Sequence, residues 1–239
     1  MSDLNLTSGS ITYSIRESSR TKRLHLKLNR LAEIEVVIPL KTKPTEIENF
    51  VNKNLSWINR QRKLIVEKNL QGGNSSVFPP QEIKLSLLDA RFSVDYKSCT
   101  KTPSFSVDGT NITILANTDE EKRKQLKHFI HQVAKIELSY HLEKLSVNLG
   151  LPYNRVFIKS QKTRWGSCSS KKNINLNRNL VFLDLTQVEY LIIHELCHTI
   201  HLNHSPRYWK LVSHHCPSYQ AVDKSLKQAI HKIPLWSIV

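Results

Sequence analysis

The strongest constraint on the fold is a helical pattern that runs for about 30 residues through the middle of the chain. It begins at Thr118 and Glu121, which have the spacing of a capping box, and acidic residues fill its first turn, where the helix dipole favours them. Apolar residues then recur at three- and four-residue steps until Gly150 and Pro152, which are typical of a helix end. The sequence therefore predicts one long helix, with a boundary between two regions of the chain just before it.

Short alternating runs predict strands in the region before this helix. Apolar and polar residues alternate in three runs within the first 40 residues and in four more between residues 83 and 115. One segment, from Thr45 to about Asn69, has a helical period instead. Residues 1–116 are therefore predicted to form a β-rich N-terminal region with one helix. No internal repeat is evident.

The region from residue 117 to 239 combines the long helix with further strands and helices. Alternating runs predict strands at residues 156–160, 163–169 and 173–179, the last two as a hairpin. An apolar helix starts at Thr186 or Gln187 and runs through His201, and two more helices follow it. The predicted fold class is α+β, with residues 1–116 and 117–239 as its two domains.

The charge balance of the chain is strongly basic. Lys and Arg number 35 against 20 Asp and Glu, which leaves a net charge of +15. Such a balance favours anionic partners and makes nucleic acid or a nucleotide a candidate partner, although solvated helix and strand faces would explain it as well. No zinc-ribbon, helix-turn-helix or RNA-binding signature accompanies the charge.

Cysteine usage and hydropathy indicate the compartment. Four cysteines without a CxxC pair do not make a disulfide framework. The first residues lack the basic and apolar runs of a signal peptide, and no stretch approaches the ~18 apolar residues that span a bilayer. We therefore expect a cytoplasmic protein with no membrane partner, and we exclude collagen-like, coiled-coil, membrane-spanning and small secreted proteins.

One short motif carries chemistry. His194 and His198 stand four residues apart on the predicted apolar helix, so both rings project from the same face and can reach one Zn²⁺ ion. Glu195 lies beside them and can accept a proton from the attacking water without ligating the metal. The H-E-x-x-H pattern therefore predicts a catalytic zinc site.

A catalytic zinc has three protein ligands and one open position, so a third ligand is required. His204 follows His198 by six residues, a spacing that lets the chain turn after the helix and return to the metal. Asn203 tolerates the left-handed conformation that such a turn uses. We predict His204 as the third ligand, with His201, His214 and His215 as alternatives.

Further segments around this motif resemble the YgjP-like zinc metallopeptidase family, whose nearest relatives include the SprT-like proteases. The resemblance extends to much of the β-rich N-terminal region. The matching segments are residues 164–169, 174–177, 194–198, 203–205, 208–209 and 217–219. The resemblance implies a zincin-like metallopeptidase core that cleaves polypeptides, with His194, His198 and His204 as zinc ligands and Glu195 as the catalytic acid/base.

The predicted hairpin ahead of the zinc helix offers candidate substrate-binding residues. An edge strand beside the metal can bind an extended peptide by strand addition, which would bring Arg164 close to the substrate. Asn175 and Asn177 share one face of the return strand because side chains alternate along a strand. A purely architectural role for these residues is the alternative.

Two other functions compete with a zinc peptidase. A metal-dependent nucleoside triphosphate pyrophosphatase would use the same activated water against phosphorus, although no glycine-rich phosphate loop is present. A nucleic-acid-associated protease or adaptor would exploit the basic surface. A structural zinc in an adaptor is closed by four protein ligands and needs no adjacent glutamate, so Glu195 favours an enzyme.

Overall fold

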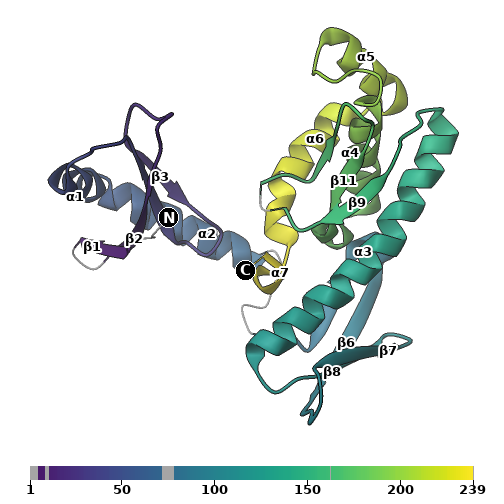
Figure 1. The fold of residues 1–239 in the computed structure, drawn as a ribbon, viewed down its shortest axis with the longest axis horizontal. Helices are drawn as coiled ribbons and strands as arrows, with labels where there is room; N and C mark the ends of the chain where they lie inside the picture. The colour runs from purple at the N-terminus through teal and green to yellow at the C-terminus, as the bar shows by residue number, and fades with distance from the viewer. Residues whose placement is uncertain (1–4, 9–10, 72–77, 162, 239) are drawn as a thin grey trace. The chain divides into compact units, whose positions relative to one another are not determined.

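The structure is a computed structural model that describes residues 5–8, 11–71, 78–161 and 163–238. The chain divides into two compact units, residues 1–76 and 77–239 (Figure 1). The boundary predicted from sequence, between residues 116 and 117, lies inside the second unit. The strands before that position and the long helix after it contribute buried side chains to one hydrophobic cluster.

The first unit is a four-stranded sheet with two helices. The sheet has the order β1 (Asn5–Ser8), β2 (Ile11–Glu17), β4 (Ile34–Ile38), β3 (His25–Leu28), and it is followed by α1 (Pro44–Lys53) and α2 (Leu55–Gln71). Val51 and Ile58 from the two helices pack with Val36 of the central strand, and all three are fully buried. The sheet and the helices therefore share one small core.

The single helix predicted from Thr45 to about Asn69 is two helices, separated at Asn54. The side-chain amide of Asn54 donates to the Phe50 carbonyl at 2.7 Å, and its backbone N–H bonds to the Val51 carbonyl at 3.0 Å. Asparagine competes in this way with regular helical hydrogen bonds. The N-terminal region accordingly has two helices rather than the one that the apolar period predicted.

The second unit begins with a sheet that repeats the topology of the first. Its order is β5 (Glu82–Leu85), β6 (Ala90–Lys97), β8 (Asn111–Leu115), β7 (Ser104–Asp108), with η1 (Ser86–Leu88) between β5 and β6. In both sheets an antiparallel pair is joined through a parallel central pair to a second antiparallel pair. This repeat was not evident in the sequence, because alternation of apolar and polar residues predicts a strand but not the strand with which it pairs.

The long predicted helix is α3 (Asp119–Leu149). Thr118 and Glu121 form the capping box at its start, and Gly150 ends it in the left-handed conformation with φ of 64°. The helix contacts β7 and β8 of the preceding sheet and β9 of the next one (Figure 1). None of the helices in the described part of the chain, α3 included, is long and apolar enough to cross a membrane.

A three-stranded sheet and a set of helices complete the second unit. The sheet has the order β10 (Gly166–Cys168), β11 (Ile174–Asn177), β9 (Val156–Lys159), with β10 at an edge. The helices are η2 (Arg178–Phe182), α4 (Leu185–Cys197), α5 (Pro206–His215), α6 (Tyr219–Gln228), η3 (Ala229–Lys232) and α7 (Leu235–Ile238). Of these elements, β10 lies against α4. The three small sheets and the separate helices confirm the predicted α+β class.

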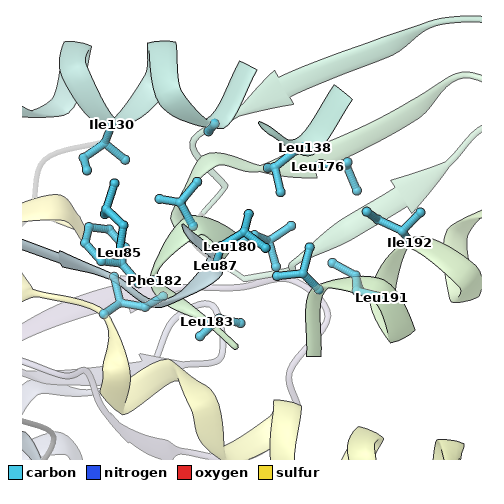
Figure 2. Packing of buried hydrophobic residues seen from close by; sticks show 14 of the residues in the cluster. Leu85, Leu87, Ile130, Leu138, Leu176, Leu180, Phe182, Leu183, Leu191 and Ile192 are labelled. Carbon is cyan, nitrogen blue, oxygen red and sulfur yellow. The ribbon is translucent and has the colours of Figure 1, made fainter. Parts of the chain in front are cut away.

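The core of the second unit surrounds α4. Leu191 and Ile192 of this helix pack with Leu138 of α3. Leu176 of β11 and Leu180 of η2 belong to the same cluster (Figure 2). The apolar residues that precede the H-E-x-x-H motif are therefore core residues. They fix the helix that carries the motif.

The two faces of α3 differ sharply in burial, which gives a matched stability test. Leu138 is fully buried, whereas Ile136, an apolar residue of the same helix, is 67% exposed. Leu138→Ala is expected to lower the free energy of unfolding by about 2–5 kcal/mol because it leaves a cavity. Ile136→Ala is expected to change it by less than about 0.5 kcal/mol. Chemical denaturation of both variants measures the difference, and equal losses would contradict the described core.

Candidate metal centre

Three histidines converge at the end of α4. One ring nitrogen from each of His194, His198 and His204 lies within 4.8 Å of the others. The Nε2 atoms of His194 and His204 are 3.3 Å apart. The ring centroids of His198 and His204 are separated by 4.7 Å. The structure thus brings together the three histidines that the sequence selected, in a group that could hold one metal ion.

The chain reverses between the second and third histidines. The apolar pattern predicted a helix through His201, but α4 ends at Cys197 and His198 is its C-cap. At the helix end the Leu196 carbonyl accepts from the Thr199 hydroxyl at 2.8 Å and from the Thr199 backbone N–H at 2.9 Å. Ser205 then caps α5 by accepting from the Tyr208 backbone N–H. This early end and sharp restart return His204 to the cluster.

His201 contributes a backbone atom and not its ring. His198 Nδ1 lies 2.9 Å from the His201 carbonyl oxygen. A carbonyl only accepts, so Nδ1 carries the proton and Nε2 of His198 keeps its lone pair for a metal. The His201 ring is outside the histidine cluster. Sequence reasoning missed this role because a main-chain carbonyl has no residue-type signature.

Two aromatic residues of α5 pack on the histidines. The Tyr208 ring stacks on His198 at a centroid distance of 4.4 Å, and the Trp209 ring stacks on His204 at 5.5 Å. The Tyr208 hydroxyl also donates to the His194 carbonyl at 3.1 Å. The packing partners of both aromatics are the histidine rings themselves, whose orientations they restrict.

Burial holds two of the three histidines, His194 and His198, in the neutral form. Burial is the main cause that lowers the pKa of His194 to about 4, and His198 and His204 lower it further. Burial also lowers the pKa of His198. A metal binds the unprotonated imidazole, so neutral rings at pH 7 spare the cost of displacing a proton. The chemistry of the donor set therefore fits a metal ion.

Glu195 occupies a buried position beside this cluster. Glu195 is 4% exposed, and its Oε2 atom has no hydrogen-bond partner among the described residues. Burial raises the pKa of Glu195 to about 8, and the Arg164 guanidinium opposes that shift. An orphaned buried carboxylate oxygen is costly unless a water or ligand completes it. The position suits a group that exchanges protons with a reactant.

Gly166 makes room for that carboxylate. A Cβ atom built on Gly166 would lie 2.5 Å from Glu195 Oε1 and 2.9 Å from its carboxyl carbon. Real side chains do not approach so closely, so the absence of a Cβ on β10 lets Glu195 rest against the strand. Sequence reasoning brought Arg164 close to the substrate but did not connect Gly166 with Glu195.

Gly166→Ala is therefore expected to displace the carboxylate without touching a histidine. Misplacement by about 1 Å of a reacting group can cost roughly 100-fold in rate. We expect a loss of this size in peptide hydrolysis with metal content unchanged, while Ser106→Ala, at an exposed position on β7 of another sheet, keeps nearly full activity. Initial rates together with metal analysis measure both effects. Wild-type rates in Gly166→Ala would show that the carboxylate position is not critical.

The predicted substrate-binding residues fall into two groups. The amide of Asn177 donates to the carbonyls of Gln161 and Arg164, at 2.7 and 3.0 Å, and the residue is buried. Both amide hydrogens are thus used within the protein, which favours for Asn177 the architectural role that the sequence offered as the alternative. Asn175 is half-buried and donates to Ser167 Oγ at 3.1 Å. Arg164 is exposed.

A comparison with protein families matches residues 22–229 to the family described as YgjP-like, metallopeptidase domain. The chain belongs to the YgjP-like family. As a YgjP-like protein it is a metallopeptidase, and its histidine cluster fits the metal ion that this class of enzyme uses. A comparison with curated proteins finds no match.

Two solved structures are similar to part of the YgjP-like chain. One is the metallopeptidase zymogen jannalysin of Methanocaldococcus jannaschii, 20% identical, with 39% of this chain and 96% of that chain covered and a TM-score of 0.35. The other is the metallopeptidase zymogen abylysin of Pyrococcus abyssi, 22% identical, with 41% and 99% covered and a TM-score of 0.37.

Proposed function

We propose that this metallopeptidase uses a zinc ion held by His194, His198 and His204. The observation that carries the proposal is the 3.3 Å separation of the His194 and His204 Nε2 atoms. Two nitrogens that each lie about 2.0–2.1 Å from a tetrahedral zinc stand about 3.3–3.4 Å apart. An all-imidazole donor set also favours zinc over magnesium or calcium, which prefer oxygen ligands.

Glu195 is proposed as the acid/base of the reaction. When bound, zinc polarises the scissile carbonyl and increases the acidity of water. A nearby cation favours the carboxylate form of Glu195 and so opposes the effect of burial on its pKa. The ionised carboxylate accepts a proton from the attacking water and then gives it to the leaving amine. The unpartnered Oε2 atom supports this role.

A polypeptide substrate is proposed to lie along β10. This strand is at the edge of its sheet and contacts α4, so an added strand there would run beside the metal centre. Gly166, on this strand, lies directly against the Glu195 carboxyl group. Arg164, which is exposed just before the strand, and Asn175, which is half-buried on its neighbour, remain proposed substrate contacts.

Metal removal tests the proposal directly. Chelation is expected to abolish casein hydrolysis and one equivalent of Zn²⁺ to restore it, while Mg²⁺ does not. Circular dichroism should show that the apo protein stays folded, because the second unit has a large hydrophobic core of its own. Nucleoside triphosphates are assayed in parallel. Zinc-dependent phosphoanhydride hydrolysis without peptide hydrolysis would overturn the proposed substrate class.

A further inference from the structure

A basic groove lies on the second unit, away from the residues of the metal centre. It has a volume of about 710 Å³ and is formed by one face of α3 together with η2. Its basic lining residues are Arg123, Lys124, Lys127, His128, His131 and Arg178. Arg178 follows Lys127 by 51 residues in sequence, so the fold and not a local run of charge assembles the groove.

The two arginines of the groove are anchored within the protein. Arg178 donates to the carbonyl of Ser237 at 3.2 Å, and the Arg123 guanidinium lies 4.5 Å from the centre of the Phe78 ring. The Nε atoms of both arginines are buried and have no hydrogen-bond partner among the described residues. Partly buried cations held in place in this way are costly unless a counter-charge compensates them.

The chain itself supplies little of that counter-charge. Glu120 is the one acidic residue in the groove lining. None of the salt bridges in the described part of the chain involves Arg123, Lys124 or Arg178. The pKa of His131 is lowered, first by burial and then by the nearby charges of Arg178, His128 and Lys135. Positive potential therefore concentrates in the groove.

We propose that this groove binds a chain of linked phosphate groups. Arg123 and His131 are eight residues apart on α3, which corresponds to about 12 Å along the helix axis. One phosphate cannot contact N–H donors over that length, whereas a phosphate chain can contact them in turn. Two sources have this chemistry, the sugar–phosphate backbone of a nucleic acid and inorganic polyphosphate. The proposal goes beyond the peptidase activity and does not depend on it.

The test compares two variants that remove equal charge. The groove variant is Lys124→Gln with Lys127→Gln. The control variant is Lys97→Gln with Lys144→Gln, at two exposed positions outside the groove. Binding of a labelled single-stranded 15-mer to the full-length protein is measured by fluorescence anisotropy over a range of salt. Inorganic polyphosphate and monophosphate are used as competitors, and thermal melting checks that each variant is folded.

We expect the groove variant to bind at least about tenfold more weakly. The slope of log K against log salt should fall by about 1.4, because each lost phosphate contact removes roughly 0.7 for a single strand. The control variant should keep most of the slope. Competition by polyphosphate but not by equimolar monophosphate supports a phosphate chain, and binding of polyphosphate alone assigns the source. Equal weakening of both variants, or no binding of either chain to the wild type, would overturn the proposal.

Discussion

Glu195→Gln is expected to keep its metal and to lose peptide hydrolysis by about 10²–10⁴-fold, the usual cost of removing a general base. The amide has the size of the carboxylate, so it fits the same buried space against Gly166. It cannot accept the proton of the attacking water. The histidine cluster does not include residue 195, so metal content should stay at the wild-type level. Initial rates and metal analysis on the same preparation measure the two quantities.

Glu189→Gln provides the matched control. Glu189 lies on the same helix, is partly exposed, and is outside the histidine cluster. The same chemical change there should leave the rate nearly unchanged. A Glu195→Gln protein that is fully loaded with metal and turns over at the wild-type rate would remove Glu195 from the mechanism.

His204→Ala is expected to weaken zinc binding by well over 100-fold. Loss of a residue that only orients a ligand costs about 10–100-fold in affinity, and loss of a ligand should exceed that range. His201→Ala is the matched control three residues earlier. It deletes a ring that lies outside the cluster and keeps the carbonyl that accepts from His198. Its affinity should stay close to that of the wild type.

Competition with a chromogenic zinc chelator measures both affinities. Strong loss in His201→Ala with little loss in His204→Ala would assign the third ligand to His201 and contradict the proposed ligand set. Little loss in either variant would direct the search to His214 or His215. These two rings pack on each other at the end of α5 and are outside the described cluster.

The metal centre was largely predictable because its information is local. The four-residue spacing of His194 and His198 alone places them on one helix face, and His204 follows His198 by only six residues. The supporting contacts were not predictable in this way. Gly166 meets Glu195 only after β10 is placed against α4, and the Asn177 amide finds its two carbonyls only once the preceding loop is folded. Such contacts depend on tertiary structure that no single segment encodes.

The fold shows the same division between local and distant information. The capping box at Thr118 and the turn at Gly150 located the long helix to within a residue or two. Strand order was not accessible, since alternation is the same whether a strand pairs with its sequence neighbour or with a more distant strand. The basic groove illustrates the point for charge. In the sequence, the basic run from Lys122 to Lys127 is typical of a solvated helix face. Only the fold brings Arg178 into the same groove.

The contact between His198 Nδ1 and the carbonyl of His201 has a consequence for how this segment can evolve. A main-chain oxygen is present whatever the amino acid, so residue 201 is free to drift in identity. The length of the loop is not free, because an insertion or deletion between His198 and His204 would carry a different carbonyl to the imidazole and misalign the returning histidine. Homologous chains should therefore differ here by substitution, and the six-residue spacing of His198 and His204 should persist where the intervening side chains do not.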